Sequence, residues 1–505
     1  MEVARIFTVQ PQVLGGTVVT IEVDISRGLH SFSIVGLAGK AVDESKDRVG
    51  SAIKHSGFDS PKTKNQKVVV SLSPADLKKE GPLFDLPIAI AYLIAAGDVK
   101  IQNAKTIFIG ELGLDGTLKP VKGVLNCVMT AASKGYSEVI VPAENADEAA
   151  LVPNITITAA KTLSEVIEHI DESKPEKIIN PHPETSIPDG WYESAIQLED
   201  IKGQESAKRG LIIAAAGKHN VMLVGPPGTG KTMLARALRG LLPPLTNSEA
   251  LAVTAIHSLA GNSFEISARP PFRSPHHTAS HTALVGGGST PKPGEITLAH
   301  HGVLFMDEFP EFDRRSLDAL RQPLEERVVT ISRVQGTEEF PADFILVAAL
   351  NPYRGQEDGT TNLLGAMNQT YKNKVSGPIL DRIDIWLEVP HVDFDTLQNL
   401  PRTEGETDQA RQTILNARKQ MQKRFTSANE TTTNAHLSAR TIEETIDLSP
   451  AVKNVLKQAS QKLNLSPRSY HKLIKVSRTI ADIDGAKDIE PNHVLEALQY
   501  RVPSL

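Results

Sequence analysis

GPPGTGKT, residues 225–232, is the stretch of this sequence that decides its fold. It fits the pattern G-x-x-x-x-G-K-[ST], follows the apolar run NVMLV (220–224) and precedes the helical stretch MLARALRGLL (233–242). A glycine-rich turn that arose by chance would need neither a strand before it nor a helix after it. Backbone N–H groups of such a loop turn inward around phosphates, and the positive end of the following helix favours an anion. Lys231 is expected to reach the β- and γ-phosphates of ATP, and the Thr232 hydroxyl to ligate Mg²⁺. The predicted nucleotide-binding residues are Gly225, Pro226, Pro227, Gly228, Thr229, Gly230, Lys231, Thr232 and Met233.

Two further apolar runs end in side chains suited to the same chemistry. GVLFMDEF (302–309) ends in Asp307, predicted to hold Mg²⁺, and Glu308, predicted to orient and polarise the attacking water. FILVAALNP (344–352) ends in Asn351, whose amide is predicted to sense the γ-phosphate or to position water. Taken alone, each run could be an ordinary strand with a polar end, and Asn-Pro commonly opens a turn. Beside the phosphate loop, both favour a nucleotide-hydrolysing site.

Two arginines are candidates for stabilising charge on the γ-phosphate. Arg382 lies in SGPILDRIDI (376–385), ahead of an apolar strand, and could reach the nucleotide of a neighbouring subunit as an arginine finger. The alternative is a surface cluster with its acidic neighbours. Arg468 lies in the first turn of LSPRSYHKLIKVSRTIADI (465–483) and could swing over the nucleotide, or else belong to a solvated helix face. Arg478 in the same stretch is the weaker candidate.

Composition divides the chain into five parts. Residues 1–170 alternate short β-branched runs with helical stretches, which predicts an α/β domain. Residues 171–194 are rich in proline and charge and are predicted to be a linker. Over 195–395 helices alternate with almost wholly apolar strands, as expected of a parallel sheet buried on both faces. A polar connection is predicted for 396–436, and a helical block for 437–505.

Bulk composition limits the class of protein. The 505 residues are 40% hydrophobic and 23% charged, with a formal net charge of −6, which indicates a soluble multidomain protein and not a basic nucleic-acid coat. A local basic patch can still bind phosphates. Cys127 is the single cysteine, so an internal disulfide is excluded and a reducing cytosol fits. No signal peptide and no apolar run of about 20 residues is found, so we expect a cytoplasmic protein without membrane contact.

The order of these motifs resembles the AAA+ ATPase fold, with the helical block as its lid. IKGQESAKRGLIIAAAGKHN (201–220) resembles the AAA+ entry segment, which implies that Ile201 lies near the adenine. Residues 269–308 resemble the magnesium-chelatase-like branch with its helix-2 insertion, and 326–344 resemble the β-hairpin that this branch places before the Asn351 strand. With HSFSIVGLAGKAVDESKDRVGSAI (30–53), nearly the whole chain resembles the YifB/ComM family of bacterial proteins.

The resemblance implies that residues 1–170 form an α/β Lon-protease-like domain of the ribosomal-protein-S5 type. In KKEGPLFD (78–85) the nucleophilic serine of Lon would fall at Leu83, and in KGVLNC (122–127) its partner lysine would fall at Leu125. Leucine can neither attack a carbonyl nor accept a proton. We therefore predict a proteolytically inactive domain ahead of a P-loop AAA+ core.

One departure from the family concerns metal binding. Many relatives carry a cysteine-rich run after the Asn-Pro pair, whereas this sequence has NPYRGQEDGTTN (351–362), so we expect no zinc. Five histidines lie within 276–301, but adjacent pairs project in different directions and make poor paired ligands. We expect these histidines to pack or to contact phosphate.

The resemblance implies a hexameric ring that uses ATP to drive branch migration of DNA in homologous recombination and natural transformation. An arginine finger also requires a head-to-tail interface. Basic residues with few aromatics favour sequence-independent contact with single-stranded or branched DNA, although these residues could simply solvate a loop. Recombination proteins are further candidate partners. The alternative is a magnesium-chelatase-like protein-remodelling ATPase without DNA activity; a protease is disfavoured by the missing dyad. The candidate DNA contacts are Arg273, His276, His277, Lys292 and Arg333.

Overall fold

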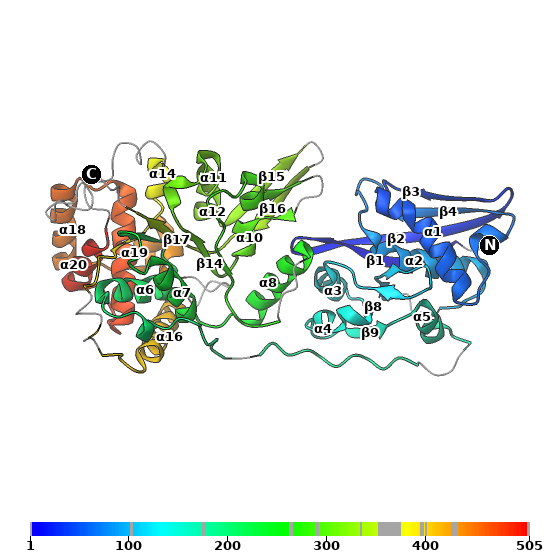
Figure 1. Cartoon of the computed structure of the whole chain (residues 1–505), viewed down its shortest axis with the longest axis horizontal. Helices are drawn as coiled ribbons and strands as arrows, with labels where there is room; N and C mark the ends of the chain where they lie inside the picture. The colour runs from blue at the N-terminus through cyan, green and yellow to red at the C-terminus, as the bar shows by residue number, and fades with distance from the viewer. Residues whose placement is uncertain are drawn as a thin grey trace. The chain divides into compact units, whose positions relative to one another are not determined.

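The computed structural model describes most of the chain as two units (Figure 1). Unit 1 consists of Met1–Pro188 and Ala250–Ser267, and unit 2 of Asp189–Glu249 and Ala268–Leu505. No helix in the described part of the chain is long and apolar enough to cross a membrane. The described residues are 3–101, 105–173, 178–188, 190–261, 266–288, 292–333, 336–351, 375–393, 398, 401–425 and 433–501, without the side chains of 332–337.

Unit 1 is built on a seven-stranded mixed sheet with the order β3-β4-β2-β1-β5-β8-β9. Antiparallel pairing joins β1 to β2 and β2 to β4, while the other neighbours are parallel. β1 and β2 form a long hairpin, paired from Ala4 opposite Val23 to Gln12 opposite Gly15. The strands are β1 (Ala4–Gln12), β2 (Gly15–Arg27), β3 (Ser31–Val35), β4 (Gln66–Ser73), β5 (Thr106–Phe108), β8 (Glu138–Pro142) and β9 (Thr156–Ala160), with a small separate pair of β6 (Glu111–Leu112) and β7 (Leu118–Lys119).

Helices complete the hydrophobic core of unit 1. α2 is almost entirely apolar, and like α3 it packs against β1 and β2. The predicted N-terminal α/β domain is therefore confirmed at the level of fold class. Its helices are α1 (Lys40–His55), α2 (Asp85–Ala96), α3 (Val124–Ser133), α4 (Ala146–Ala149) and α5 (Leu163–Ile170).

Helix α8 (Asn247–Ala260) follows the phosphate loop in sequence, yet from Ala250 onward it belongs to unit 1. Ala255 is part of the hydrophobic core of that unit. The backbone N–H of Gly123 also donates to the Ser258 hydroxyl over 3.0 Å. Unit 1 is thus discontinuous in sequence, which the composition of the chain did not suggest.

Unit 2 is built on five parallel strands with the order β11-β14-β17-β10-β18. Every residue of β10, β14 and β17 is buried, as expected of central strands covered on both faces. The predicted parallel α/β core is confirmed. The strands are β11 (Phe272–Arg273), β14 (Val303–Met306), β17 (Ile345–Leu350), β10 (Val221–Val224) and β18 (Ile385–Glu388), with two hairpins outside the sheet, β12 (Gly286–Gly287) with β13 (Lys292–Pro293) and β15 (Val328–Arg333) with β16 (Gly336–Pro341).

Helices of different lengths flank this sheet. α6 and α7 pack against each other, and α6 also contacts β18. The connection from β11 to β14, residues 274–302, is called the insertion below. The helices outside the C-terminal part are α6 (Glu205–Gly217), α7 (Lys231–Leu241), α9 (His281–Val285), α10 (Glu295–Leu298), α11 (Arg314–Asp318), α12 (Arg321–Glu326) and α14 (Gly377–Leu380).

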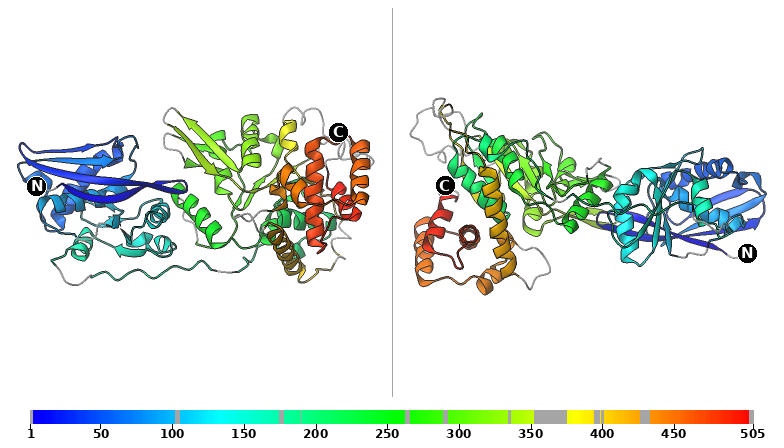
Figure 2. Two further views of the ribbon diagram at one scale, coloured as in Figure 1. Left: turned by 180° about the vertical axis from the view of Figure 1, so that it is seen from behind. Right: turned by 90° about the horizontal axis from the view of Figure 1, so that it is seen from below.

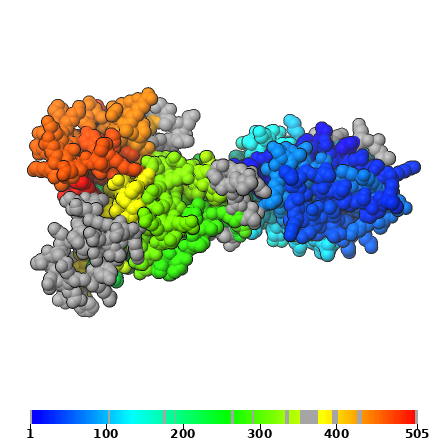
Figure 3. All heavy atoms as spheres, turned by 90° about the horizontal axis from the view of Figure 1, so that it is seen from above, coloured from blue at the N-terminus to red at the C-terminus, as the bar shows by residue number. Residues whose placement is uncertain are grey.

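The C-terminal part is helical, as predicted, and Figure 3 shows its surface in orange and red. A helix missing from the sequence prediction, α16 (Glu406–Arg424), occupies much of the segment expected to be a polar connection. It packs beside α19, and Figure 2 shows it in gold. Its buried positions include Ala410, Ile414, Ala417 and Met421. The other helices are α17 (Ala439–Thr445), α18 (Pro450–Leu463), α19 (Pro467–Ile483) and α20 (Pro491–Gln499).

The described residues of the predicted linker, 171–194, form neither helix nor strand. The first of them belong to unit 1, where the backbone N–H of His182 donates to the Ile157 carbonyl over 2.8 Å. The last of them belong to unit 2, where the guanidinium groups of Arg239 and Arg269 lie 5.1 and 3.0 Å from the ring centre of Tyr192. Each half is therefore bound to its own unit.

Candidate functional site

The phosphate loop joins β10 to α7 at the carboxyl edge of the sheet. Gly228 and Gly230 have φ angles of 79° and 93°, which favour glycine. At Gly225 a Cβ atom would meet the Val389 carbonyl oxygen at 2.2 Å, so no side chain fits there. The Gly225 N–H donates to the Leu350 carbonyl over 3.2 Å, which fixes the start of the loop to the end of β17. The glycines are thus required by backbone geometry.

Lys231 begins α7 and is nearly buried. Its Nζ atom donates to the carbonyl oxygens of Gly225 and Pro226, both over 2.7 Å. Burial lowers the pKa of this ammonium, and the nearby Asp307 carboxylate opposes that shift. The loop therefore holds a cation at the place where the sequence predicts a phosphate.

Thr232 and Asp307 lie together, as a shared Mg²⁺ site requires. The Thr232 hydroxyl donates to Oδ2 of Asp307 over 3.4 Å, and Oδ1 accepts from the Glu308 N–H over 2.8 Å. Hydroxyl and carboxylate oxygens are ligands that Mg²⁺ prefers, with water completing its octahedron. These two side chains fit the ion; among the described residues, no cluster of three or more His, Cys, Asp or Glu side chains suits another metal site.

Asn351 follows β17, which lies beside the loop strand β10, and Glu308 follows β14, which is the next strand beyond β17. β14 and β17 pair with Met306 opposite Ala348, and β17 and β10 pair with Leu350 opposite Val224. The residues that follow these strands consequently share one edge of the sheet. Glu308 has a left-handed backbone, φ 49° and ψ 44°, and its side chain is 48% exposed. Oε2 of Glu308 lies 3.1 Å from Nδ1 of His277, a partner that the sequence did not suggest.

The two candidate arginines meet on a third side chain, Glu325 of α12. An Nη atom of Arg382 pairs with Oε2 of Glu325, and Nη2 of Arg468 lies 3.5 Å from Oε1. Arg382 also donates to the Pro378 carbonyl over 2.6 Å. Arg478 is buried and pairs with Asp482 of its own helix over 2.9 Å, so its observed role is structural.

The remaining nucleotide-binding candidates lie before the phosphate loop and at the start of α7. Ile201 is buried in the core of unit 2, and Met233, just inside α7, is 38% exposed. Gln204 of the same entry segment donates to the Pro390 carbonyl over 2.7 Å.

The candidate DNA contacts are engaged to different degrees. Arg273 forms a two-point ion pair with Glu295, over 2.6 and 2.7 Å, which neutralises its charge. The rings of His276 and His277 lie 4.2 Å apart. Lys292 is exposed on β13. The side chain of Arg333 lies outside the described part of the chain, as do residues 352–362 of the run expected to lack zinc.

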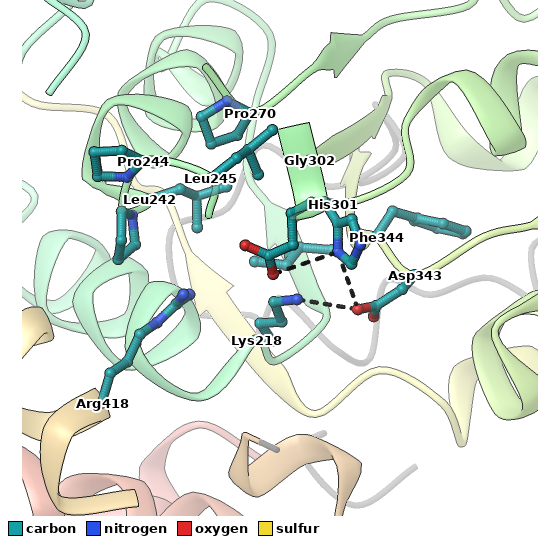
Figure 4. Close-up of a pocket in the computed structure, with 13 residues that line it drawn as sticks. Lys218, Leu242, Pro244, Leu245, Pro270, His301, Gly302, Asp343, Phe344 and Arg418 are labelled. Atoms are coloured by element: carbon teal, nitrogen blue, oxygen red, sulfur yellow. Dashed lines mark hydrogen bonds and ion pairs between the residues drawn. The ribbon is translucent and has the colours of Figure 1, made fainter. Parts of the chain in front are cut away.

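A second cluster of charged groups lies at the opposite, amino ends of the same strands (Figure 4). Lys218 donates to Asp343 over 3.0 Å, while His301 and His436 lie 3.5 and 3.2 Å from its carboxylate. Burial favours the neutral form of Asp343, but these three neighbours hold the pKa of its carboxyl well below its usual range. Burial lowers the pKa of His436 to about 4. The cavity beside this cluster has a volume of about 20 Å³ and holds one water molecule at most. We therefore assign a structural role to the cluster.

The positions expected for a Lon dyad are part of the core of unit 1. Leu83 is 4% exposed and Leu125 is fully buried. Both side chains belong to the hydrophobic cluster that includes α2 and β1. Neither could present a reactive group at the surface even if its chemistry allowed it.

Comparison with known proteins identifies the family. Residues 197–397 match the family described as "Magnesium chelatase, subunit ChlI", 21–145 match "Subunit ChlI of Mg-chelatase", and 404–501 match "Magnesium chelatase, subunit ChlI C-terminal". The chain is 43% identical to competence protein ComM of Haemophilus influenzae, over 99% of this chain and 98% of that protein. It belongs to the YifB/ComM family of magnesium chelatase ChlI-like proteins. The uncharacterized protein YifB of Escherichia coli is 41% identical, over 96% of this chain and 94% of its own.

Membership of the YifB/ComM family implies an ATPase that binds ATP with Mg²⁺. A Lon protease of Bacillus thuringiensis is also similar, with 25% identity over 164 residues, 31% of this chain and 20% of the protease. The predicted family resemblance is thereby confirmed over nearly the full length of the chain.

Proposed function

We propose that this protein is an AAA+ motor that hydrolyses ATP to move DNA strands, with branch migration in homologous recombination and natural transformation as its task. The observation that supports it most is the convergence of Lys231, Thr232, Asp307, Glu308 and Asn351 at one edge of a parallel sheet. The printed name of its relative ComM, a competence protein, supports the DNA role.

Each residue of the proposed site has a separate task. Lys231 and the N–H groups of the loop bind the phosphates, and Thr232 and Asp307 offer oxygens to Mg²⁺. The ion, when bound, neutralises charge on the phosphate oxygens. Glu308 polarises the attacking water, and Asn351 orients it. Ile201 and Met233 are proposed to lie near the base of the nucleotide.

We propose that the protein works in the cytoplasm as a head-to-tail hexameric ring, in which Arg382 would complete the site of a neighbouring subunit. Arg468 shares Glu325 with Arg382, so we assign both arginines to the same γ-phosphate. Unit 1 would be a Lon-like domain without protease activity, which the similarity to Lon and the core positions of Leu83 and Leu125 support.

Steady-state ATPase activity with and without DNA tests this function. We expect single-stranded or forked DNA to raise turnover several-fold over the protein alone, with little dependence on base sequence. The Glu308→Gln variant serves as the blank. A rate that no DNA form changes would favour the alternative, a protein-remodelling ATPase like magnesium chelatase, to which three segments of the chain are similar.

Mixing variants tests the role of Arg382 between subunits. Arg382→Ala should bind ATP normally and turn over about 1,000-fold more slowly, because an arginine finger stabilises transition-state charge. Combined with equal amounts of Lys231→Ala, it should recover about a quarter of wild-type activity, since about one interface in four then pairs an intact loop with an intact arginine. No recovery by co-assembled rings, verified by light scattering, would contradict a role in trans.

A further inference from the structure

Unit 1 carries an open groove of about 650 Å³, whereas the phosphate loop belongs to unit 2. The groove is lined by Phe7 of β1 and Val18 of β2, by residues 134–136 between α3 and β8, and by Lys105 before β5. Ligand sites in proteins typically have volumes of about 300–1,000 Å³. The groove is therefore large enough for a ligand the size of a nucleotide.

Two aromatic rings in this groove are held in place while they stay partly exposed. Phe7 is partly exposed, whereas its neighbours Ile6 and Thr8 are buried, because side chains alternate between the two faces of a strand. Its ring centre lies 5.7 Å from that of Tyr136, at an interplanar angle of 60°. This edge-to-face packing fixes the direction of the Tyr136 ring. Partly exposed aromatic rings are platforms on which nucleic-acid bases stack.

The charge around these rings is positive. Lys105 and Lys134 are both exposed, and none of the described residues that line the groove is acidic. Lys134 directly follows the last turn of α3, where the helix dipole favours a cation. The Ser137 N–H donates to the Lys105 carbonyl over 3.0 Å, which holds the two segments that carry the lysines together. The groove therefore favours an anion, although the whole chain has a formal net charge of −6.

We propose that this groove binds single-stranded DNA, with a base stacked on Tyr136 and phosphates at Lys105 and Lys134. Duplex DNA does not offer the faces of its bases, so an unpaired strand suits the aromatic rings. Lysines attract phosphate oxygens whatever the base, and stacking tolerates every base, so binding is independent of sequence. The inference rests on the proposed function. It gives the motor a second hold on the strand, in the unit that lacks the ATPase site.

Variants of the full-length protein test the stacking contact. Tyr136→Leu keeps an apolar side chain against Phe7 but removes the stacking surface, so the Kd for a fluorescent oligothymidylate should rise about tenfold. Tyr136→Phe keeps the ring and should bind as the wild type does. Fluorescence anisotropy measures both values. The ATPase rate without DNA should stay unchanged in both variants, because the groove contains no part of the nucleotide site.

The phosphate contact is tested by the salt dependence of the same titration. Lys134→Ala should reduce the slope of log Kd against log salt by about 0.7, the value for one phosphate contact on a single strand. Lys54→Ala, at an exposed position in the last turn of α1, is the matched control and should leave the slope unchanged. Melting temperatures equal to that of the wild type would show that the variants are folded.

Photocrosslinking locates the contact independently of the overall affinity. Iododeoxyuridine placed in the same oligonucleotide reacts on irradiation with an aromatic side chain that touches the base. Mass spectrometry should find the crosslink on Tyr136, and the crosslink should be absent in Tyr136→Leu.

The outcomes separate this groove from the DNA function itself. If the wild type binds single-stranded DNA, but Tyr136→Leu and Lys134→Ala bind it equally well and Tyr136 forms no crosslink, the groove proposal is overturned while the proposed function stands. If the wild type binds no DNA, both fail. If hexaglutamate competes as strongly as the oligonucleotide and Tyr136→Leu weakens neither ligand, the groove recognises charge alone, which would overturn its assignment to a nucleic acid.

Discussion

Lys231→Ala is expected to abolish ATP binding at micromolar nucleotide and to remove measurable hydrolysis. In the structure the Lys231 ammonium lies on the carbonyl oxygens of Gly225 and Pro226, at the mouth of the loop. Two charge-assisted hydrogen bonds to phosphate oxygens contribute on the order of 3–4 kcal/mol, so affinity should fall about 100- to 1,000-fold. Titration with a fluorescent ATP analogue measures this loss directly.

A structural side effect of the same change must be separated from the loss of affinity. Removing the ammonium leaves two loop carbonyls without their donor, which costs about 1–3 kcal/mol if water does not replace it. The melting temperature without nucleotide reports that cost. Lys453→Ala, at an exposed position of α18, is the matched control and should change neither quantity. Affinity within threefold of the wild type would refute the role given to Lys231.

The part of the site that could be predicted from sequence is the part encoded locally. The phosphate loop lies between a strand and a helix that are adjacent in sequence, so one short pattern specifies its backbone and its cation. β14 and β17 were recognisable because buried parallel strands are continuously apolar. Because parallel strands end at the same edge of a sheet, the polar residues that follow β14 and β17 were expected to lie together at the carboxyl edge.

The contacts between distant segments could not be predicted in this way. β11 has two residues inside the proline-rich stretch RPPFRSP (269–275), where neither period nor β-branching indicates a strand. Because β11 was not expected from the sequence, the contact between Nδ1 of His277 and Oε2 of Glu308 could not be expected either. The shared partner of Arg382 and Arg468 is equally non-local, because Glu325 lies in a six-residue helix with no distinctive pattern.

Helix α16 is different, since its signal was present. Ala410, Ile414, Ala417 and Met421 follow the spacing i, i+4, i+7 and i+11 of one helix face. The other positions of α16 are mostly polar, and so are the residues around the helix. The composition of the segment therefore predicts a polar connection, although one face of the helix is apolar. The discontinuity of unit 1 had no local signal, because nothing in the sequence of α8 indicates that the helix belongs to unit 1 from Ala250 onward.

Glu308→Gln is expected to bind ATP with nearly wild-type affinity and to hydrolyse it about 1,000-fold more slowly. Glutamine keeps the size of the side chain but cannot accept the proton of the attacking water, and general-base catalysis contributes about 10²- to 10⁴-fold. The loop contacts of Lys231 and the Thr232–Asp307 pair do not involve this carboxylate. Binding and turnover should therefore separate.

Rapid filtration of labelled ATP on the Glu308→Gln variant measures that separation, because unhydrolysed nucleotide should remain bound to the protein. Glu311→Gln, three residues further on and exposed, is the matched control and should turn over as the wild type does. Normal turnover by Glu308→Gln would remove the carboxylate from the reaction, and the base would then have to be sought among the other side chains at this edge of the sheet.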